Sequence, residues 1–391
     1  MTYDAIVVGA GPAGSACAHR LAGAGASVLM LDRARFPRDK PCGGGVTGRA
    51  ARLLPFPLDP VIEDVVTIAE LGLGYDGRRC ERGSGEPLAY MTQRIRLDAH
   101  LAEHAVAAGA AFRDGTKVER VEADDESVTV AAGGERLRAQ TLVGADGVNG
   151  ITARALDLGG NQAVGVALEG NVPYSKLDRG RYGGRIVLEL GVVPGGYGWV
   201  FPKGDHANVG IGGWEEEGPR LRAHLARMCA AHGICADDLE ALRGYRLPLR
   251  SPRSTVARGR ALVVGDAAGL VDPLSGDGMY EAFLSGQLAA EAVEDVLAGR
   301  ETTLEPYGPR LGRQLAVHLW ASWGIKVALD RFPRTTFAIT KTRPVWNVIE
   351  KLVRGEMADV SGARGLARAP LKLLALLARA AGDPGRVYRE A

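Results

Sequence analysis

The first fourteen residues constrain the fold more than any other part of the chain. Residues 3–9 form a short apolar run rich in β-branched side chains, and residues 9–14 then read Gly-Ala-Gly-Pro-Ala-Gly before an alanine-rich stretch. This order is typical of a buried parallel strand, a tight turn and a helix. A second apolar run, residues 27–32, ends in an aspartate. We therefore expect a right-handed β-α-β crossover that binds a dinucleotide.

Each glycine of this turn has a physical role in holding a pyrophosphate. Gly9 permits the tight turn, Gly11 lets the backbone approach the phosphates, and Gly14 permits close packing of helix and strand. The first N–H groups of the helix point at the same place. Asp32 is positioned to accept hydrogen bonds from ribose hydroxyls. The motif fits both NAD and FAD, so it does not choose between them.

Two later segments favour FAD. Residues 142–147 read Leu-Val-Gly-Ala-Asp-Gly, and residues 264–269 read Val-Gly-Asp-Ala-Ala-Gly. The second segment ends a strand with Asp266, whose carboxylate can bind a ribityl chain, and a new helix N-terminus follows. A fold that binds only NAD has no need for this distant element. Because the chain holds one Gly-x-Gly-x-x-Gly, we expect NAD(P)H or another reductant to dock only transiently.

Composition narrows the class of protein. The 391 residues are 46% hydrophobic and carry a formal net charge of only +2, which indicates a folded protein of two or three domains and argues against a nucleic-acid partner. The five cysteines form no Cys-x-x-Cys pair, so we expect reduced thiols, no metal site and a cytoplasmic location. The oligomeric state stays open.

The C-terminal part differs from the rest in charge. Residues 301–391 hold 15 Lys and Arg against 8 Asp and Glu, a balance of +7, whereas the first 300 residues have a balance of −5. A basic, leucine-rich tail on an acidic body suggests peripheral contact with an anionic membrane. A solvated helical face is the alternative.

Two styles of pattern alternate along the chain and predict its organisation. Buried parallel-type strands return late in the sequence, after a region of alternating and aromatic residues that suits an antiparallel sheet. We expect an α/β fold: a Rossmann-like FAD-binding domain, an inserted antiparallel β-sheet domain for the substrate, and a C-terminal helical region. The expected limits are 1–70, 92–157 and 255–300 for the FAD-binding domain, 71–91 and 158–254 for the substrate domain, and 301–391 for the helical region.

The motifs together resemble a known superfamily. The set Gly-x-Gly-x-x-Gly, Asp-Gly and Gly-Asp, in this order, is similar to the FAD-dependent hydroxylases of the para-hydroxybenzoate hydroxylase type. Within that superfamily, residues 41–45 (Pro-Cys-Gly-Gly-Gly) resemble a loop of the geranylgeranyl reductases. Residues 197–203 (Tyr-Gly-Trp-Val-Phe-Pro-Lys), 208–212 and 272–279 resemble three further segments of these reductases. The resemblance covers roughly residues 1–300.

The resemblance implies roles for individual residues. The cofactor-binding set that it implies is Gly9, Gly11, Pro12, Ala13, Gly14, Asp32, Arg33, Cys42, Gly43, Arg96, Asp146, Gly265, Asp266, Pro273, Gly276, Gly278 and Met279. Within it, Arg96 contacts the phosphates or the flavin from the start of an amphipathic helix predicted over residues 96–109. Pro273, Gly276 and Gly278 lie along the isoalloxazine. The candidate catalytic residues are Cys42, Gly43, Gly44, Tyr197 and Trp199. The candidate substrate-binding residues are Tyr197, Trp199, Phe201 and Lys203, although a surface position is the alternative for Lys203.

The chain departs from the family pattern at four positions. Asp32 stands where glutamate is more usual, and Gly150 stands where a serine hydroxyl is usual. Asp272 and Asp277 replace asparagine and glutamate. The shortening at Asp277 puts the exact substrate in doubt.

The activity that the resemblance implies is reduction of carbon–carbon double bonds in a polyprenyl lipid of the geranylgeranyl type or a prenylated quinone. Such a reaction needs hydride from reduced flavin, an apolar channel and a proton source. Cys42 is the candidate proton donor or gate. One alternative is an FAD-dependent aromatic monooxygenase or halogenase, and another is a non-catalytic flavin-binding redox protein. His100 and His104 are four residues apart on a helix, but no third ligand accompanies them, so we expect no metal.

Overall fold

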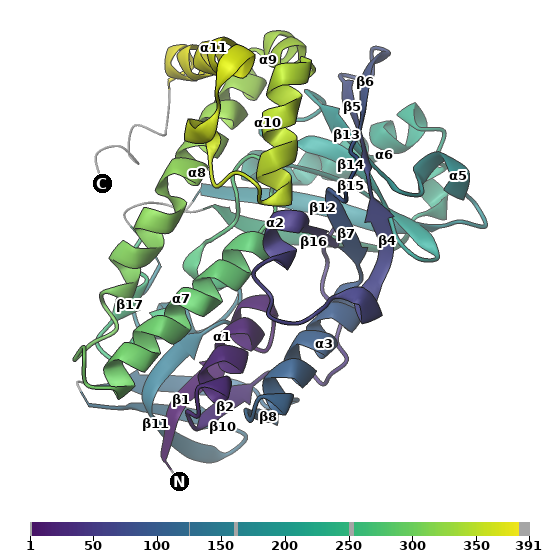
Figure 1. Ribbon diagram of the computed structural model, residues 1–391. Helices are drawn as coiled ribbons and strands as arrows, with labels where there is room; N and C mark the ends of the chain where they lie inside the picture. The colour runs from purple at the N-terminus through teal and green to yellow at the C-terminus, as the bar shows by residue number, and fades with distance from the viewer. Residues whose placement is uncertain (1, 125, 160–162, 250–253, 383–391) are drawn as a thin grey trace.

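The computed structural model describes residues 2–124, 126–159, 163–249 and 254–382 as three β-sheets with helices packed around them (Figure 1). The first sheet has a parallel centre in the spatial order β18-β11-β1-β2-β8. These strands are β18 (Ala261–Val263), β11 (Glu135–Gly144), β1 (Thr2–Val8), β2 (Val28–Leu31) and β8 (Ala111–Arg113). Antiparallel additions are β9 (Val118–Ala123), β10 (Val128–Ala132) and β17 (Ala257–Arg258).

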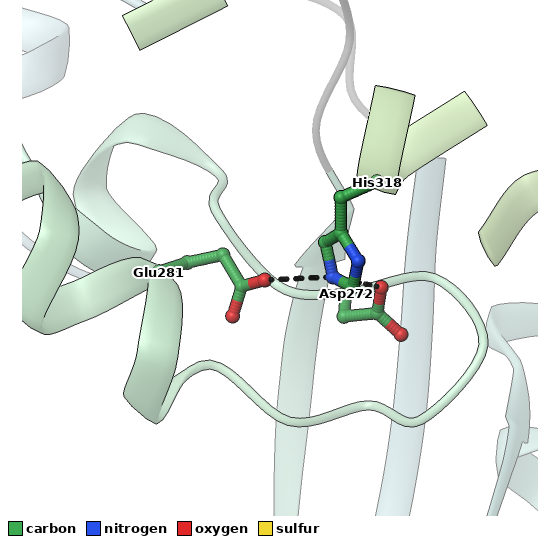
Figure 2. A group of neighbouring side chains, drawn as sticks. All are labelled: Asp272, Glu281 and His318. Atoms are coloured by element: carbon green, nitrogen blue, oxygen red, sulfur yellow. Dashed lines mark ion pairs between the residues drawn. The ribbon is translucent and has the colours of Figure 1, made fainter. Parts of the chain in front are cut away.

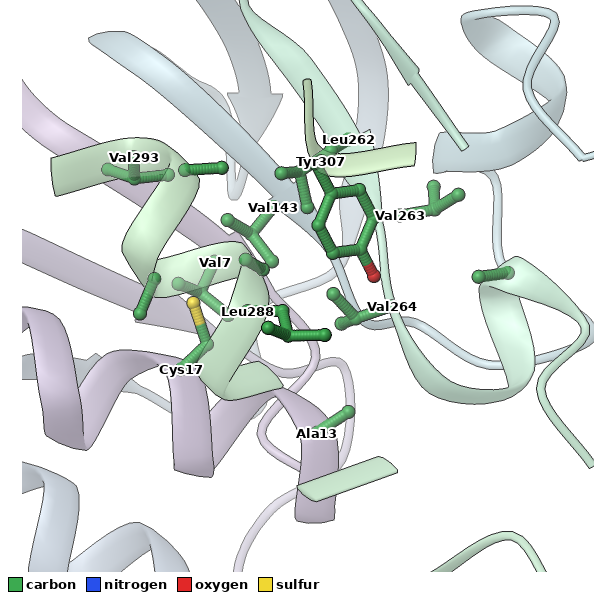
Figure 3. Packing of buried hydrophobic residues seen from close by; sticks show 14 of the residues in the cluster. Val7, Ala13, Cys17, Val143, Leu262, Val263, Val264, Leu288, Val293 and Tyr307 are labelled. Atoms are coloured by element: carbon green, nitrogen blue, oxygen red, sulfur yellow. The ribbon is translucent and has the colours of Figure 1, made fainter. Parts of the chain in front are cut away.

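One face of this sheet forms the largest hydrophobic core. Helices α1 (Pro12–Gly23) and α7 (Met279–Leu297) cover it, and α8 (Tyr307–Arg331) adds its first half. Figure 3 shows Val7 and Val143 of the strands packed against Cys17, Leu288 and Tyr307 of these helices. All five side chains are buried. The strands are buried because both faces are covered, which explains their continuous apolar runs.

The second sheet has seven strands, and its two faces differ. Its order is β16-β12-β15-β14-β13-β5-β6, antiparallel except that β5 and β13 run parallel. Helices α5 (Arg179–Tyr182) and α6 (Leu221–Ala231) lie against one face. The strands are β5 (Ile68–Leu73), β6 (Arg78–Gly83), β12 (Ala163–Pro173), β13 (Arg185–Leu190), β14 (Tyr197–Pro202), β15 (His206–Trp214) and β16 (Glu240–Leu249).

A small third sheet lies between the other two. It pairs β3 (Gly45–Thr47) and β4 (Ile62–Val66) with the central β7 (Ala89–Thr92), and it is followed in sequence by α3 (Arg94–Ala107). The short helix α2 (Gly48–Ala51) follows β3 in this region, whereas α4 (Thr152–Ala155) packs near β9 of the first sheet. The Pro-Cys-Gly-Gly-Gly loop, residues 41–45, leads directly into β3 of this sheet.

The C-terminal region is helical. After α8 come α9 (Pro333–Thr340), α10 (Arg343–Arg354) and α11 (Arg368–Ala380). Pro333 is the first residue of α9 and Pro344 lies in the first turn of α10, where a missing N–H costs nothing. These prolines therefore begin helices. Figure 1 shows α8 running beside α7 and continuing to the cluster of α9, α10 and α11.

The predicted fold class is confirmed. Strand β11 is continuous because it pairs with β10 over its first half and with β1 and β18 over its second. The helix predicted to begin at Arg96 begins at Arg94. The predicted domain limits stay a prediction. Among the described residues, no helix is both long and apolar enough to cross a bilayer.

The closest backbone approach in the first β-α-β unit leads to a stability prediction. A Cβ on Gly14 would lie 1.9 Å from the carbonyl oxygen of Gly9, whereas a Cβ on Gly23 of the same helix would have no neighbour within 4 Å. We expect Gly14→Ala to destabilise the fold by about 3 kcal/mol or more and to lose bound flavin. Gly23→Ala should be neutral or stabilising by up to about 1 kcal/mol. Thermal unfolding and flavin content of the two variants test this; equal melting temperatures would contradict it.

Candidate active site

A cavity of about 900 Å³ extends from the glycine-rich turn to the C-terminal helices. All three sheets contribute to its wall. One end is polar and is lined by Gly9, Gly11, Asp32, Arg38, Arg94, Asp146 and Asp266. The other end is apolar and is lined by residues of β5, β13, β14 and of the helices α8 to α11. The cavity therefore joins a site suited to an anionic cofactor to a space suited to a hydrophobic chain.

Two arginines stand over the glycine-rich turn. A Cβ on Gly11 would lie 3.2 Å from Nη2 of Arg38 and 3.8 Å from Nη2 of Arg94. Asp98, fully buried, accepts hydrogen bonds of 2.7 Å from Nε and Nη2 of Arg94, and its Oδ2 lies 2.7 Å from Nη1 of Arg38. One carboxylate thus holds two guanidinium groups, which leaves one net positive charge beside the N-terminus of α1. This arrangement suits a pyrophosphate.

Arg96 was predicted to contact the cofactor, and the structure places it elsewhere. Its guanidinium donates 2.7 Å and 2.5 Å hydrogen bonds to Glu63 and to the carbonyl of Pro60, and its side chain is half exposed. It lies outside the cavity because the helix starts two residues earlier than the sequence indicated. Arg94 holds the inward position instead, and the sequence signal that could have found it is its i,i+4 spacing to Asp98.

Asp32 and Asp146, at the polar end of the cavity, differ in how many of their carboxylate oxygens have hydrogen-bond partners. Both carboxylate oxygens of Asp32 accept backbone N–H groups, from Ala10 at 3.0 Å and from Ala34 at 2.9 Å. Asp146 uses Oδ2 for the backbone N–H groups of Ile151 and Thr152, while its Oδ1 is buried without a hydrogen-bond partner among the described residues. Asp146 Oδ1 therefore needs a donor that the described protein atoms do not supply.

The missing serine at position 150 has a steric explanation. A Cβ on Gly150 would lie only 2.1 Å from Cγ of Asp146, so a serine does not fit this backbone. The neighbouring hydroxyl of Thr152 donates to Asp146 Oδ2 at 2.9 Å. Thr152 thus makes the hydroxyl contact that the family pattern assigns to a serine at position 150.

Asp266 lies on the cavity wall and has two protein partners. Its Oδ2 accepts hydrogen bonds from Nζ of Lys40 at 2.8 Å and from the hydroxyl of Tyr245 at 2.9 Å. Burial works against the charge, but the Lys40 ammonium outweighs it and lowers the pKa of Asp266. Gly265 beside it has φ +54°, a conformation that favours glycine, and its N–H is bound by Ser285.

The Pro-Cys-Gly-Gly-Gly loop approaches β14 closely. A Cβ on Gly43 would lie 2.9 Å from the ring of Phe201, and Gly44 has φ +77°. The backbone N–H of Cys42 donates to Oε1 of Glu169 at 2.7 Å, and the N–H of Gly44 contacts the Cys42 Sγ at 3.3 Å. These contacts fix the thiol at the cavity wall.

Lys203 was predicted to bind substrate or to lie on the surface, and the structure shows neither position. Its side chain is buried, lies outside the large cavity, and donates to the carbonyl oxygens of Gly43 at 2.5 Å and Thr92 at 2.7 Å. Burial lowers its pKa to about 8, although Cys42 and Glu169 oppose this shift. Lys203 thus clamps the glycine-rich loop from behind. It faces a second cavity of about 60 Å³ that it shares with Cys42 and Glu169.

The apolar wall comes from alternate residues of the seven-stranded sheet. Along β13, Ile186, Leu188 and Leu190 line the cavity while Val187 packs toward α6. This alternation is the period-two pattern of a strand with two different faces. Tyr197, Trp199 and Phe201 of β14, which were predicted to bind substrate, line the cavity. The Trp199 ring lies against Gly210 and donates to Asn208 at 2.8 Å, so it is held rigidly.

The C-terminal helices close the apolar end, which sequence reasoning missed. Trp346 of α10 lines the cavity. Helix α10 is fastened beside the cysteine loop, because Gly48 of α2 and Gly355 leave room for the two backbones to meet. The lining residues from this region include Ile325, Leu329, Thr336, Val345, Trp346, Ile349, Leu352, Val353, Val360, Leu371 and Leu374.

The loop of residues 272–279 borders the cavity and is anchored from α8. Pro273, Gly276, Gly278 and Met279 line the cavity. Behind them, Nε2 of His318 lies 3.2 Å from Asp272 and 3.3 Å from Glu281 (Figure 2). Burial opposes a charge on this imidazole, but the two carboxylates outweigh it and raise the pKa of His318 to about 9.

This group of two carboxylates and a histidine also has the composition of a metal site. Nε2 of His318 faces the two carboxylates, whereas Nη1 of Arg49 lies 3.1 Å from Nδ1, the other nitrogen of the ring. The raised pKa of His318 favours a charged imidazolium between the two carboxylates, and we interpret the cluster as an ion-pair network. His100 and His104 pack with Phe56, and Nε2 of His100 lies 2.9 Å from the carbonyl of Pro57.

Comparison with known proteins agrees with this geometry. Residues 2–307 match the family model described as FAD binding domain. The chain is 34% identical over 308 residues to a geranylgeranyl diphosphate reductase of Rhodobacter capsulatus, which covers 75% of each chain. It is 32% identical over 312 residues to a menaquinone reductase of Mycobacterium tuberculosis, which covers 74% of this chain and 76% of the other. The chain belongs to the geranylgeranyl reductase family of FAD-dependent oxidoreductases.

Structural comparison gives the same fold over the whole chain. The crystal structure of a geranylgeranyl bacteriochlorophyll reductase-like protein from Thermoplasma acidophilum superimposes with a TM-score of 0.78 and covers 100% of this chain and 98% of its own. The two sequences are 23% identical.

The residues at the polar end fit FAD. The glycine turn leaves a cradle that a Cβ would fill, Arg38 and Arg94 offer positive charge, and Asp146 Oδ1 awaits a donor. A dinucleotide supplies phosphates for the first two features and hydroxyl groups for the third.

The two arginines give the first test of this site. We expect Arg94→Gln and Arg38→Gln each to weaken FAD binding by about 10- to 100-fold, because each removes a charged contact beside the glycine turn. Arg96→Gln, on the same helix as Arg94 but facing Glu63, should change FAD affinity by no more than about twofold. Fluorescence titration of flavin-free protein measures all three, and circular dichroism checks that each is folded. A loss of affinity in Arg96→Gln equal to that in Arg94→Gln would contradict the assignment.

The His318 cluster predicts how stability depends on pH. A histidine whose pKa rises from 6.5 to about 9 on folding stabilises the fold fully below about pH 6.5 and loses this contribution as pH rises through about 9. The stability difference between wild type and His318→Gln should therefore shrink between pH 6 and 9.5, by on the order of 2–3 kcal/mol. Taking the difference removes the opposite effect of Lys203, whose lowered pKa makes stability rise with pH between about 8 and 10.5. Denaturant unfolding at several pH values measures it, and a constant difference would refute the charge on His318.

Proposed function

We propose that this protein saturates carbon–carbon double bonds of a polyprenyl lipid or a prenylated quinone. The observation that carries the proposal is the single cavity that joins the FAD-binding end to an apolar space walled by β13, β14 and the C-terminal helices. Such a space suits an isoprenoid chain, whose only strong interaction with protein is hydrophobic burial. The names of the two curated relatives describe reduction of compounds that carry isoprenoid chains, which supports the same reading.

The residues around the cavity would position the substrate and exclude water. Tyr197, Trp199 and Phe201 form one wall near the cysteine loop, and Trp346 faces the cavity from α10. Reduced FAD would supply the hydride, and NAD(P)H or another reductant would renew it. The rigid packing of Trp199 and of the loop clamped by Lys203 would hold the reacting bond at a fixed place in the cavity.

The reaction also needs a proton, because a hydride and a proton together add two hydrogen atoms across one double bond. Cys42 lies on the wall of both the large cavity and the small polar one. Its thiol would give its proton to the substrate carbon and regain one from the side of Glu169 and Lys203. The small cavity, about 60 Å³, has room for water molecules that link these groups.

The direct test is to incubate dithionite-reduced enzyme with geranylgeranyl diphosphate and with a prenylated quinone without oxygen. Reoxidation of the flavin and a product heavier by two hydrogen atoms per reduced bond are expected. An aromatic monooxygenase or halogenase would instead consume oxygen when an aromatic substrate and NAD(P)H are added. No flavin reoxidation with any polyprenyl compound would overturn the proposal and leave the non-catalytic flavoprotein.

The cysteine assignment predicts a specific loss. We expect Cys42→Ala to lower the rate of product formation by about 100-fold or more, because general acid catalysis contributes that much. Cys42→Ser should lie between wild type and Cys42→Ala. Exposed Cys235 provides the control, and Cys235→Ala should leave the rate unchanged. Single-turnover rates are measured together with flavin content; full activity of Cys42→Ala with normal flavin content would remove Cys42 from the mechanism.

A further inference from the structure

Helix α11 has three distinct faces. At about 100° per residue, its exposed arginines and lysine fall within about 40° of one another around the helix. Exposed apolar residues occupy the adjacent 60° or so, and buried ones lie on the opposite side. We call the first group the basic stripe (Arg368, Lys372 and Arg379) and the second the apolar stripe (Leu373 and Leu376, with Leu366 just before the helix).

The apolar stripe is unusually exposed. Leu366 is 83% exposed, Leu376 57% and Leu373 45%, and these are three of the seven large hydrophobic residues exposed in the described part of the chain. Residues 361–382 contain four arginines or lysines and no acidic residue. A stripe of leucines beside a stripe of cations is the pattern of a helix that lies in the interface of a membrane.

The buried face of the same helix belongs to the cavity. Leu371 and Leu374 line its apolar end, and Val360 of the preceding turn does so as well. Helix α11 therefore lies between the apolar cavity and the surface that carries the two stripes. Figure 1 shows it at the end of the molecule away from the N-terminus, beside α8 and α9.

We propose that α11 docks this protein on an anionic lipid bilayer, and that lipid substrate enters the cavity at this helix. The apolar stripe would lie among the acyl chains and the basic stripe against the headgroups. The charge of the segment favours an anionic lipid surface over a neutral one, because four cations and no acidic residue lie in residues 361–382. A basic stripe directly beside an apolar stripe fits the boundary between headgroups and acyl chains, whereas an acidic protein groove would not bury the exposed leucines. The entry of substrate rests on the proposed function, whereas the docking does not.

The docking is tested by flotation with vesicles of phosphatidylcholine alone or mixed with phosphatidylglycerol. We expect the full-length protein to float with the anionic vesicles at low salt, and to be released as salt increases. Replacing the basic stripe by glutamine (Arg368→Gln, Lys372→Gln and Arg379→Gln together) should lower the partition coefficient by on the order of 100-fold. The matched control replaces three exposed arginines elsewhere by Arg154→Gln, Arg222→Gln and Arg227→Gln and should retain binding.

The apolar stripe is tested separately. The double variant Leu373→Glu with Leu376→Glu should lower vesicle binding by at least about 10-fold. The control Val106→Glu on α3, where the valine is 45% exposed like Leu373, should leave vesicle binding unchanged. No flotation of the wild type with anionic vesicles, or equal flotation of all variants, would overturn the proposal.

Light scattering without vesicles is expected to give the same mass for the wild type and the double variant. A dimer that the double variant dissociates would instead identify the surface as a contact between two copies of the chain and would overturn the proposal.

Substrate entry has its own readout. The double variant should reduce a short, detergent-dispersed prenyl substrate at the wild-type rate but should lose activity on a long-chain substrate held in vesicles. If the wild type reduces neither the detergent-dispersed nor the vesicle-held substrate, the proposed function is contradicted but the docking is not. Equal rates on vesicle-held substrate for wild type and double variant would refute entry at α11.

Discussion

A single helix fixes the apolar half of the cavity relative to the dinucleotide site. The first turns of α8 are part of the core of the first sheet, where Tyr307, Leu311 and Leu315 are buried. Its last turns place Ile325 and Leu329 on the cavity wall. Because α8 belongs both to the core of the first sheet and to the cavity wall, the C-terminal helices are positioned by the same packing that positions the glycine-rich turn. The seven-stranded sheet needs this cover, since its cavity face would otherwise expose a row of aliphatic side chains.

Close backbone approach is the second constraint, and glycine permits it where the site requires precision. Gly14 brings α1 against the turn at Gly9, and Gly43 brings the cysteine loop against Phe201. Lys203 donates to the carbonyl oxygens of Gly43 in this loop and of Thr92 in β7, and the Cys42 N–H donates to Glu169. Close backbone approach thus helps to hold all parts of the cavity, since Gly48 and Gly355 also let α2 and the end of α10 meet beside the apolar end.

The sequence predicted the parts of this site whose geometry is local. The glycine turn, Asp32, the cysteine loop and the alternation of β14 are each contained within one short segment, and the structure places them on the cavity wall. What failed depends on position around a helix or on distant partners. A shift of two residues in the start of α3 exchanges Arg96 for Arg94 as the inward side chain. The burial of Lys203 depends on Gly43 and Thr92, which are more than a hundred residues away, and no local pattern reports it. The contribution of the C-terminal helices was missed for the same reason.

The acidic departures near the cavity find their explanation in α8. Asp272 replaces a neutral asparagine, and a buried carboxylate without a partner would cost several kcal/mol. His318 supplies the compensating charge, and Asp272 Oδ1 accepts the backbone N–H groups of Leu274 and Ser275. Burial and the neighbouring Glu281 meanwhile raise the pKa of Asp277, which favours its neutral form beside the cavity. The loop that borders the flavin site is therefore fixed from the helix that also walls the apolar cavity. Substitutions on that helix should be felt at both ends of the cavity, although α8 lies outside the region that matches the FAD-binding family model apart from its first residue.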